Sequence, residues 1–254
     1  MARAAVPGRL TGRTPWRVAR LAEFRDETPS ARSLVLDVDG WSGHVPGQHV
    51  DVRLTAEDGY QAQRSYSIAS PPDGERVELT VQRVPEGEVS EYLTEGYPVG
   101  AVMEVRGPVG GWFVWRPGDH DPLLLVAGGS GVVPLMAMIR TRAAVGSRTP
   151  FRLVYSVRTP VDVYYADELR RRAAGDPALE TSLIYTRSAP AGYPRPAARL
   201  VAADVAAAGW SPADRPACFV CGPTGFVEAM ADTLVGLGHD PARIRTERFG
   251  PTGG

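Results

Sequence analysis

The sequence predicts two domains: an antiparallel Greek-key β-barrel, followed by an α/β domain with a doubly wound, parallel, five-stranded sheet. In residues 16–117, apolar and polar residues alternate in short segments separated by glycine, proline and aspartate. In residues 118–254, continuous apolar runs alternate instead with helical periodicity. These two patterns set the predicted domain limits. A disordered N-terminal segment is predicted over residues 1–15.

Each element of the first domain follows from the alternation. Strands are predicted at residues 31–38, 48–54, 64–70, 76–84 and 101–107. A short helix is expected at 90–95. Five or six strands of this kind, separated by turn signals, favour a barrel.

In the second domain, strands and helices alternate. Strands are predicted at residues 122–129, 151–157, 179–186, 217–222 and 243–249, and helices at 132–144, 163–173, 200–208 and 226–237. Such alternation gives a parallel sheet, for which we expect the strand order 3-2-1-4-5.

The composition excludes several classes of protein. The net charge of −1 gives no overall electrostatic attraction to nucleic acid or to a membrane surface. No apolar run is long enough to span a bilayer. All 28 basic residues are arginine, so a Walker-type phosphate loop and Schiff-base chemistry are excluded. Two cysteines fit a reducing cytoplasm. We therefore expect a cytoplasmic protein without membrane insertion or nucleic-acid binding.

The strand "RSYSIAS" carries a mixed set of side chains. Because residues two apart share a face of a strand, Arg64 and Tyr66 lie together, and Ser65 and Ser67 lie opposite. A guanidinium beside an aromatic plane suits an anionic ligand that also has a flat ring. The alternative is a half-exposed strand with its tyrosine in the core.

The segment "GGSGVVP", residues 128–134, lies between the first parallel strand and the first helix. Gly129, Ser130 and Gly131 would allow backbone N–H groups to approach a pyrophosphate at the helix N-terminus. The pattern departs from the usual G-x-G-x-x-G fingerprint, and a tight turn without a ligand is the alternative.

The segment "CFVCGPTG" ends the fourth parallel strand. Its Cys-x-x-Cys spacing suggests a metal or redox pair, but zinc and iron–sulfur sites usually take four ligands and the chain has no second pair. Residues three apart face opposite sides of a strand, so we expect Cys218 in the core. Cys221 stands at the carboxyl end, where open parallel sheets bind ligands. No metal site is predicted.

Together these segments resemble the ferredoxin–NADP reductase superfamily. The motifs that carry the resemblance, in chain order, are R-x-Y-S at 64–67, "GEVSEYL" at 87–93, "GGSGVVP" at 128–134, "CGP" at 221–223 and "ERF" at 247–249. The barrel segment is most similar to reductase components of bacterial oxygenases. The chain has neither the length nor the cysteines for the iron–sulfur domain that these often carry.

The resemblance implies a flavin site on the barrel, with FAD as the expected cofactor and FMN as the alternative. Arg64 would pair with the pyrophosphate, with Ser65 beside it; Tyr66 would lie against the isoalloxazine ring, and Ser67 near its N5 atom. The remaining contacts would come from Val81, Arg83, Val89 and Ser90.

The resemblance also places Cys221 and Gly222 beside the nicotinamide and Phe249 near the flavin. Ser67, Cys221 and Glu247 would be the catalytic residues. For Glu247 and Phe249 the alternative is a last strand that only packs into the sheet, because the chain continues beyond Phe249.

Residues at the ends of the second and third parallel strands favour NADPH over NADH. Arg158 follows the second strand, Thr186 and Arg187 end the third, and Arg199 opens the next helix. The two strands are neighbours in the expected order, so these groups could converge on a 2′-phosphate, and the resemblance matches Thr186 and Arg187 to a Ser-Arg pair. Two alternatives remain: solvated surface arginines, and an NADH site in which the nearby Asp162 binds the ribose 2′-OH.

The predicted function is an FAD-dependent NAD(P)H oxidoreductase, a monomer that passes electrons to a separate redox-partner protein. One alternative is a reductase of a small molecule such as free flavin or a quinone. The other is a non-catalytic binding subunit that has kept the fold.

Overall fold

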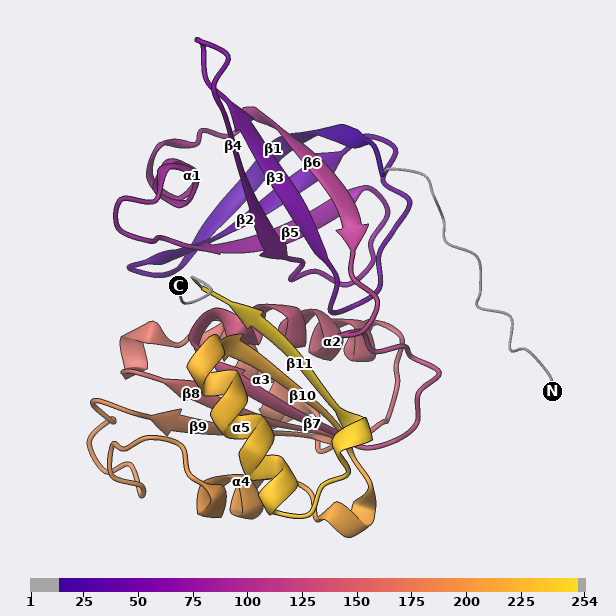
Figure 1. The fold of residues 1–254 in the computed structure, drawn as a ribbon, viewed down its shortest axis with the longest axis vertical. Helices are drawn as coiled ribbons and strands as arrows, with labels where there is room; N and C mark the ends of the chain where they lie inside the picture. The colour runs from indigo at the N-terminus through magenta and orange to yellow at the C-terminus, as the bar shows by residue number, and fades with distance from the viewer. Residues whose placement is uncertain (1–13, 251–254) are drawn as a thin grey trace, which may run out of the picture.

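The computed structural model describes residues 14–250. It has two parts, a barrel-like antiparallel sheet and an α/β unit (Figure 1). The disordered N-terminal segment predicted over residues 1–15 lies outside the described residues, except for Thr14 and Pro15.

Six antiparallel strands form the first part. They are β1 (Trp16–Thr28), β2 (Ala31–Val38), β3 (His49–Thr55), β4 (Gln61–Ser67), β5 (Arg76–Gln82) and β6 (Val102–Val109), in the order β4-β3-β6-β1-β2-β5. The edge strands meet just after β4, where Ile68 bridges Leu79, so the sheet curls towards closure. The predicted antiparallel barrel is therefore confirmed. The short helix lies slightly earlier than expected, as α1 (Glu88–Glu91) followed by a π-helical turn (Tyr92–Gly96).

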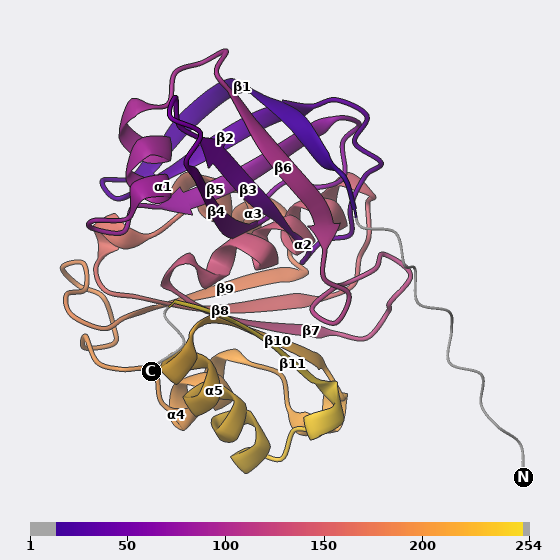
Figure 2. The same cartoon turned by 45° about the horizontal axis from the view of Figure 1, so that its top comes forward.

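The second part is a parallel sheet with helices on both faces. Its strands are β7 (Leu123–Gly128), β8 (Phe151–Val157), β9 (Leu179–Tyr185), β10 (Ala217–Pro223) and β11 (Ile244–Phe249). Its helices are α2 (Val132–Ala144), α3 (Ala166–Gly175), α4 (Ala202–Ala208) and α5 (Thr224–Gly236). The order β11-β10-β7-β8-β9 confirms the predicted 3-2-1-4-5 arrangement. Figure 2 shows α2 and α3 between the sheet and the barrel, and α4 and α5 on the far face.

The two parts share a hydrophobic core. Ala31 and Ala69 of the first part belong to the same buried cluster as α2 and the central parallel strands. In the joining segment, Phe113 and Trp115 pack edge-on against Phe219 and Phe151, with ring centroids 5.3 and 5.2 Å apart. The predicted boundary after residue 117 falls just beyond these aromatic contacts.

No helix within residues 14–250 is long and apolar enough to cross a membrane.

Candidate active site

A cavity of about 250 Å³ lies where the carboxyl ends of the central parallel strands face the barrel. Its lining includes six residues that the sequence singled out: Gly129, Ser130, Arg158, Asp162, Thr186 and Phe249. Ser30 and Gln82 from the first part complete one wall. The structure thus brings the glycine loop and the last strand together at an interdomain cavity.

Close backbone packing explains the glycines around this cavity. A Cβ atom on Gly131 would overlap the carbonyl oxygen of Cys221 and lie 2.8 Å from the backbone nitrogen of Gly222. Cβ atoms on Gly128 and Gly222 would lie 2.7 and 2.8 Å from the ring of Phe226. The loop before α2 is therefore pressed directly onto the end of β10. Gly222 is buried here, beside Phe226.

A hydrogen bond joins the two parts beside this packing. The hydroxyl of Ser67, at the end of β4, donates to Oε1 of Glu247 on β11 at 3.2 Å. Burial raises the pKa of Glu247 to about 7, although the bond from Ser67 acts to lower it. A carboxyl group with this pKa can hold or release a proton near neutral pH.

Cys221 lies opposite Glu247 in the parallel register of β10 and β11. Its side chain is fully buried, and burial, followed by the charge of Glu247, raises the pKa of its thiol well above the usual value. The thiol therefore stays protonated near neutral pH.

The R-x-Y-S strand presents two different faces. Arg64 is exposed, and its guanidinium donates to the carbonyl of Gln63 and forms no ion pair within the described part of the chain. Tyr66 is half-buried against the barrel core, and burial raises the pKa of its hydroxyl to about 12. Ser65 faces away and donates to Asp51 at 2.6 Å. These contacts agree with both interpretations of the strand: Arg64 is open to an anionic ligand, but Tyr66 packs partly against the barrel core, and Ser65 is engaged within the barrel.

Arg64→Ala should weaken FAD binding by roughly 1.5–3 kcal/mol, because a charge-assisted contact to phosphate would be lost. Equilibrium dialysis of FAD measures the effect. Arg20→Ala is a matched control, since Arg20 is also exposed and donates to a backbone carbonyl, that of Gly100. An unchanged dissociation constant in Arg64→Ala would show that this guanidinium does not hold the cofactor.

The other residues assigned to flavin binding are mostly engaged internally. Val81 and Val89 are buried in the barrel core. The hydroxyl of Ser90 accepts from the backbone of Val84 at 3.1 Å and donates to the carbonyl of Gly87 at 3.2 Å, which fixes the loop before α1. These residues can therefore shape the site without presenting free polar groups.

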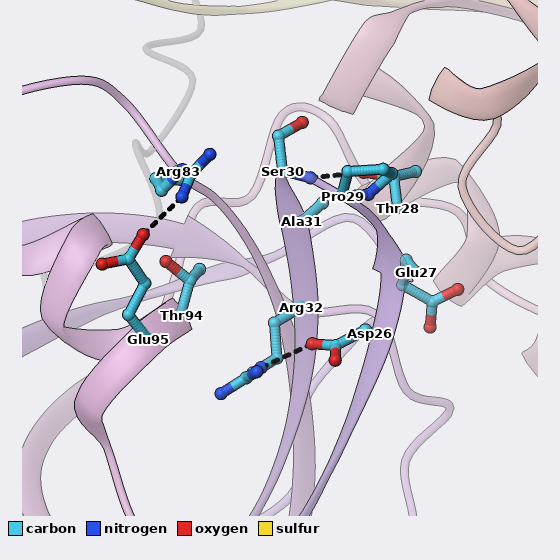
Figure 3. Close-up of a pocket in the computed structure, with 10 residues that line it drawn as sticks. All are labelled: Asp26, Glu27, Thr28, Pro29, Ser30, Ala31, Arg32, Arg83, Thr94 and Glu95. Atoms are coloured by element: carbon cyan, nitrogen blue, oxygen red, sulfur yellow. Dashed lines mark hydrogen bonds and ion pairs between the residues drawn. The ribbon is translucent and has the colours of Figure 1, made fainter.

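Arg83 lies in a second cavity, of about 490 Å³, beside the β1–β2 turn (Figure 3). Its guanidinium pairs with Glu95, and on the opposite wall Arg32 pairs with Asp26 at 2.7 Å. Ser30 lines both cavities. The two cavities therefore adjoin at Ser30, whose carbonyl accepts from the backbone N–H of Arg83 at 2.8 Å.

The arginines expected at a 2′-phosphate are exposed. Arg158, Arg187 and Arg199 form no ion pair within residues 14–250. The backbone N–H of Arg187 donates to the carbonyl of Arg158 at 2.9 Å, which holds the ends of the two strands together. Arg158 and Thr186 line the interdomain cavity, whereas Arg187 and Arg199 do not.

Sequence reasoning did not single out Ser30, Gln82, Tyr164 or Phe226, which also line the cavity. Ser30 follows a proline in a turn and belongs to no motif that would mark it, whereas Gln82 lies between Val81 and Arg83, which the sequence did single out. Phe226 lies three residues after the "CGP" motif, and this proximity was the only available signal.

Comparison with known proteins agrees with this geometry. Residues 19–114 match the family model of the oxidoreductase FAD-binding domain, and residues 125–232 match that of the oxidoreductase NAD-binding domain. Ferredoxin–NADP reductase B of Sorangium cellulosum is 33% identical over 91% of this chain and 96% of its own length.

Two further similar proteins are reductases by name. The ferredoxin–NAD(P)(+) reductase component of the naphthalene 1,2-dioxygenase/salicylate 5-hydroxylase systems of Ralstonia is 31% identical over 82% of this chain, which spans 61% of that relative. The cytochrome P450 reductase GcoB of Amycolatopsis has a TM-score of 0.78 at 28% identity, over 93% of this chain and 70% of its own. This chain therefore spans about three fifths of the oxygenase reductase component. By its sequence and its fold, the chain belongs to the ferredoxin–NADP reductase superfamily of FAD- and NAD(P)-binding oxidoreductases.

Proposed function

We propose that this protein takes hydride from NADPH and passes the electrons through FAD to a separate redox protein. The observation that carries this proposal is the Ser67–Glu247 hydrogen bond, which joins the flavin-side strand to the last strand of the nucleotide domain beside the cavity. Bound FAD would supply the hydride-accepting chemistry. The chain's own residues bind, align and shield the reactants.

The side chains divide this work. Arg64 holds phosphate and Tyr66 supports the ring face. Ser67 and Glu247 form a polar pair that can hold a proton beside the reacting atoms, because the pKa of Glu247 lies near 7. The glycine loop carries the nicotinamide pyrophosphate, and buried Cys221 closes the floor beneath it.

A protein acceptor is favoured by the relatives, two of which are named as reductases of ferredoxin. The test uses purified protein loaded with FAD and compares NADPH-dependent reduction of a [2Fe–2S] ferredoxin with that of riboflavin and menadione. We expect the ferredoxin to be reduced fastest. Faster reduction of riboflavin or menadione would identify a small-molecule reductase, and failure to bind FAD would identify a binding subunit.

NADPH is the proposed donor because three exposed arginines, which form no ion pair with any residue that the structure describes, lie near the ends of β8 and β9. The competing carboxylate, Asp162, is already engaged: its Oδ2 atom accepts from the backbone and hydroxyl of Thr159 at 2.9 and 2.7 Å. Both bonds fall on Oδ2, so the Oδ1 atom of Asp162, which lines the cavity, remains the competing acceptor for a ribose 2′-OH.

Arg187→Ala should raise the KM for NADPH roughly 10- to 100-fold and leave the KM for NADH nearly unchanged, since a charged contact to the 2′-phosphate is lost. Steady-state kinetics with both donors measure the split. Arg148→Ala, an exposed arginine in the loop before β8, is the control. Equal increases in KM for NADPH and NADH, or a preference of the wild type for NADH, would contradict the proposed 2′-phosphate site.

A further inference from the structure

Arg140 is a buried arginine in α2, on the side of the parallel sheet that faces the barrel. Its side chain is only 8% exposed, and the side chains of its two carboxylate partners, Glu78 and Glu168, are 13% and 20% exposed. Burial lowers its pKa, but the hydrogen bond to Glu168 and the charges of Glu78 and Glu168 outweigh burial and raise the pKa overall. The guanidinium is therefore permanently charged.

The guanidinium joins three elements from both domains. Nη1 donates to the carbonyl of Ala69 at 3.0 Å and to Glu78 at 2.8 Å, both in the barrel domain. Nη2 donates to Glu168 on α3 at 2.6 Å, within the nucleotide domain. A planar fork of donors can hold such partners at fixed angles, which a flexible ammonium group would not.

Tyr165, directly before α3, forms a second set of hydrogen bonds that crosses between the domains, beside the set formed by Arg140. Its backbone N–H donates to Glu27 at 3.1 Å, and its hydroxyl lies 2.5 Å from that of Thr80 on β5. The Arg140 guanidinium lies 4.8 Å from the centre of the Tyr165 ring. The two crossings therefore form one polar clamp, surrounded by the shared hydrophobic core.

The clamp acts on the two segments that carry the reactants. Ala69 lies two residues after Ser67, at the flavin-side end of β4. Arg140 belongs to the helix that begins at the glycine loop. Hydride transfer requires the reacting atoms to be about 3–3.5 Å apart, and a displacement of about 1 Å can cost 10²-fold in rate.

We propose that Arg140 is a positioning residue, which fixes the glycine loop and α2 against the Ser67 end of β4 and thereby aligns nicotinamide with flavin. The inference rests on the proposed hydride transfer and adds that this transfer requires Arg140 to hold the two domains in alignment. It assigns the alignment to the bonds that cross between the domains, to Ala69 and Glu78, and not to the bond within the nucleotide domain, to Glu168.

Two matched variants separate these bonds. Glu78→Gln weakens the ion pair across the domains, and Glu168→Gln weakens the one within the nucleotide domain; the two carboxylates are similarly buried, with side chains 13% and 20% exposed. In the FAD-loaded protein, anaerobic stopped-flow with saturating NADPH should show flavin reduction slowed roughly 10- to 100-fold in Glu78→Gln, and near the wild-type rate in Glu168→Gln.

A second measurement needs no cofactor. Hydrogen–deuterium exchange of the FAD-free proteins should show faster exchange around Ala69, whose N–H donates to the carbonyl of Glu78, in Glu78→Gln but not in Glu168→Gln. Equal reduction rates or equal exchange in the two variants would overturn the positioning role. If wild-type FAD-loaded protein is not reduced by NADPH at all, the proposed function fails instead, and the exchange result still tests the clamp.

Discussion

Gly131→Ala should slow flavin reduction by NADPH roughly 10²-fold and lower the free energy of unfolding by about 1–3 kcal/mol. The added Cβ atom would overlap the carbonyl oxygen of Cys221, which is backbone and cannot rotate away. The loop, the start of α2 or the end of β10 must therefore shift. Anaerobic stopped-flow and urea unfolding measure the two effects.

Gly225→Ala is the matched control. Gly225 lies in the first turn of α5, close to the same site, but a Cβ atom there would meet no atom within 4 Å beyond its chain neighbours and the backbone of its own helix. Alanine favours a helix over glycine, so this variant should be as stable as wild type or more stable. If Gly131→Ala keeps the wild-type reduction rate, the close approach of loop and β10 is not needed for nicotinamide binding.

The second large effect concerns pH and Glu247. In the folded protein its pKa is about 7, above the value of about 4.3 of an unfolded glutamate, so the folded state binds the proton more tightly. This contribution to stability is fully present below about pH 4 and is lost as pH rises to about 7. Relative to Glu247→Gln, which cannot ionise, FAD-free wild type should lose about 2 kcal/mol between pH 4 and pH 8.

Urea unfolding at intervals across this range measures the difference. Ser67→Ala provides the control in the opposite direction. It removes the hydrogen bond that lowers the pKa of Glu247, and the loss with rising pH should become larger. Parallel curves for wild type and Glu247→Gln would show that this carboxyl does not change its pKa on folding.

The parallel sheet could be predicted closely because its strands are buried on both faces. All six residues of β7 are buried, and the predicted ranges 132–144 and 151–157 coincide with α2 and β8. The long strand β1 was not delimited, since a register shift between Leu21 and Glu23 interrupts its alternation. Its exposed Val18 and Phe24 place apolar residues on the outer face, which obscures the pattern further.

For the candidate site, sequence reasoning worked where neighbours in the chain are also neighbours in space. Arg64 and Tyr66 share one strand, and the glycine loop is continuous. The role of Arg140 could not be predicted, because nothing in its helix indicates that Glu78 and the carbonyl of Ala69 approach it from another domain. The engagement of Ser65 with Asp51 likewise depends on the register of β3 and β4.

The edge-on aromatic contacts of Phe113 and Trp115 bear on how this reductase could be recombined with others. A chimera joined after residue 117 would take both rings with its barrel and offer them to a foreign nucleotide domain. In the reciprocal chimera, Phe151 and Phe219 would face a foreign joining segment in place of Phe113 and Trp115. A junction just before Phe113 keeps all four rings together with the parallel sheet. We therefore expect folded chimeras from a junction before Phe113, and poorly folded ones from a junction after residue 117.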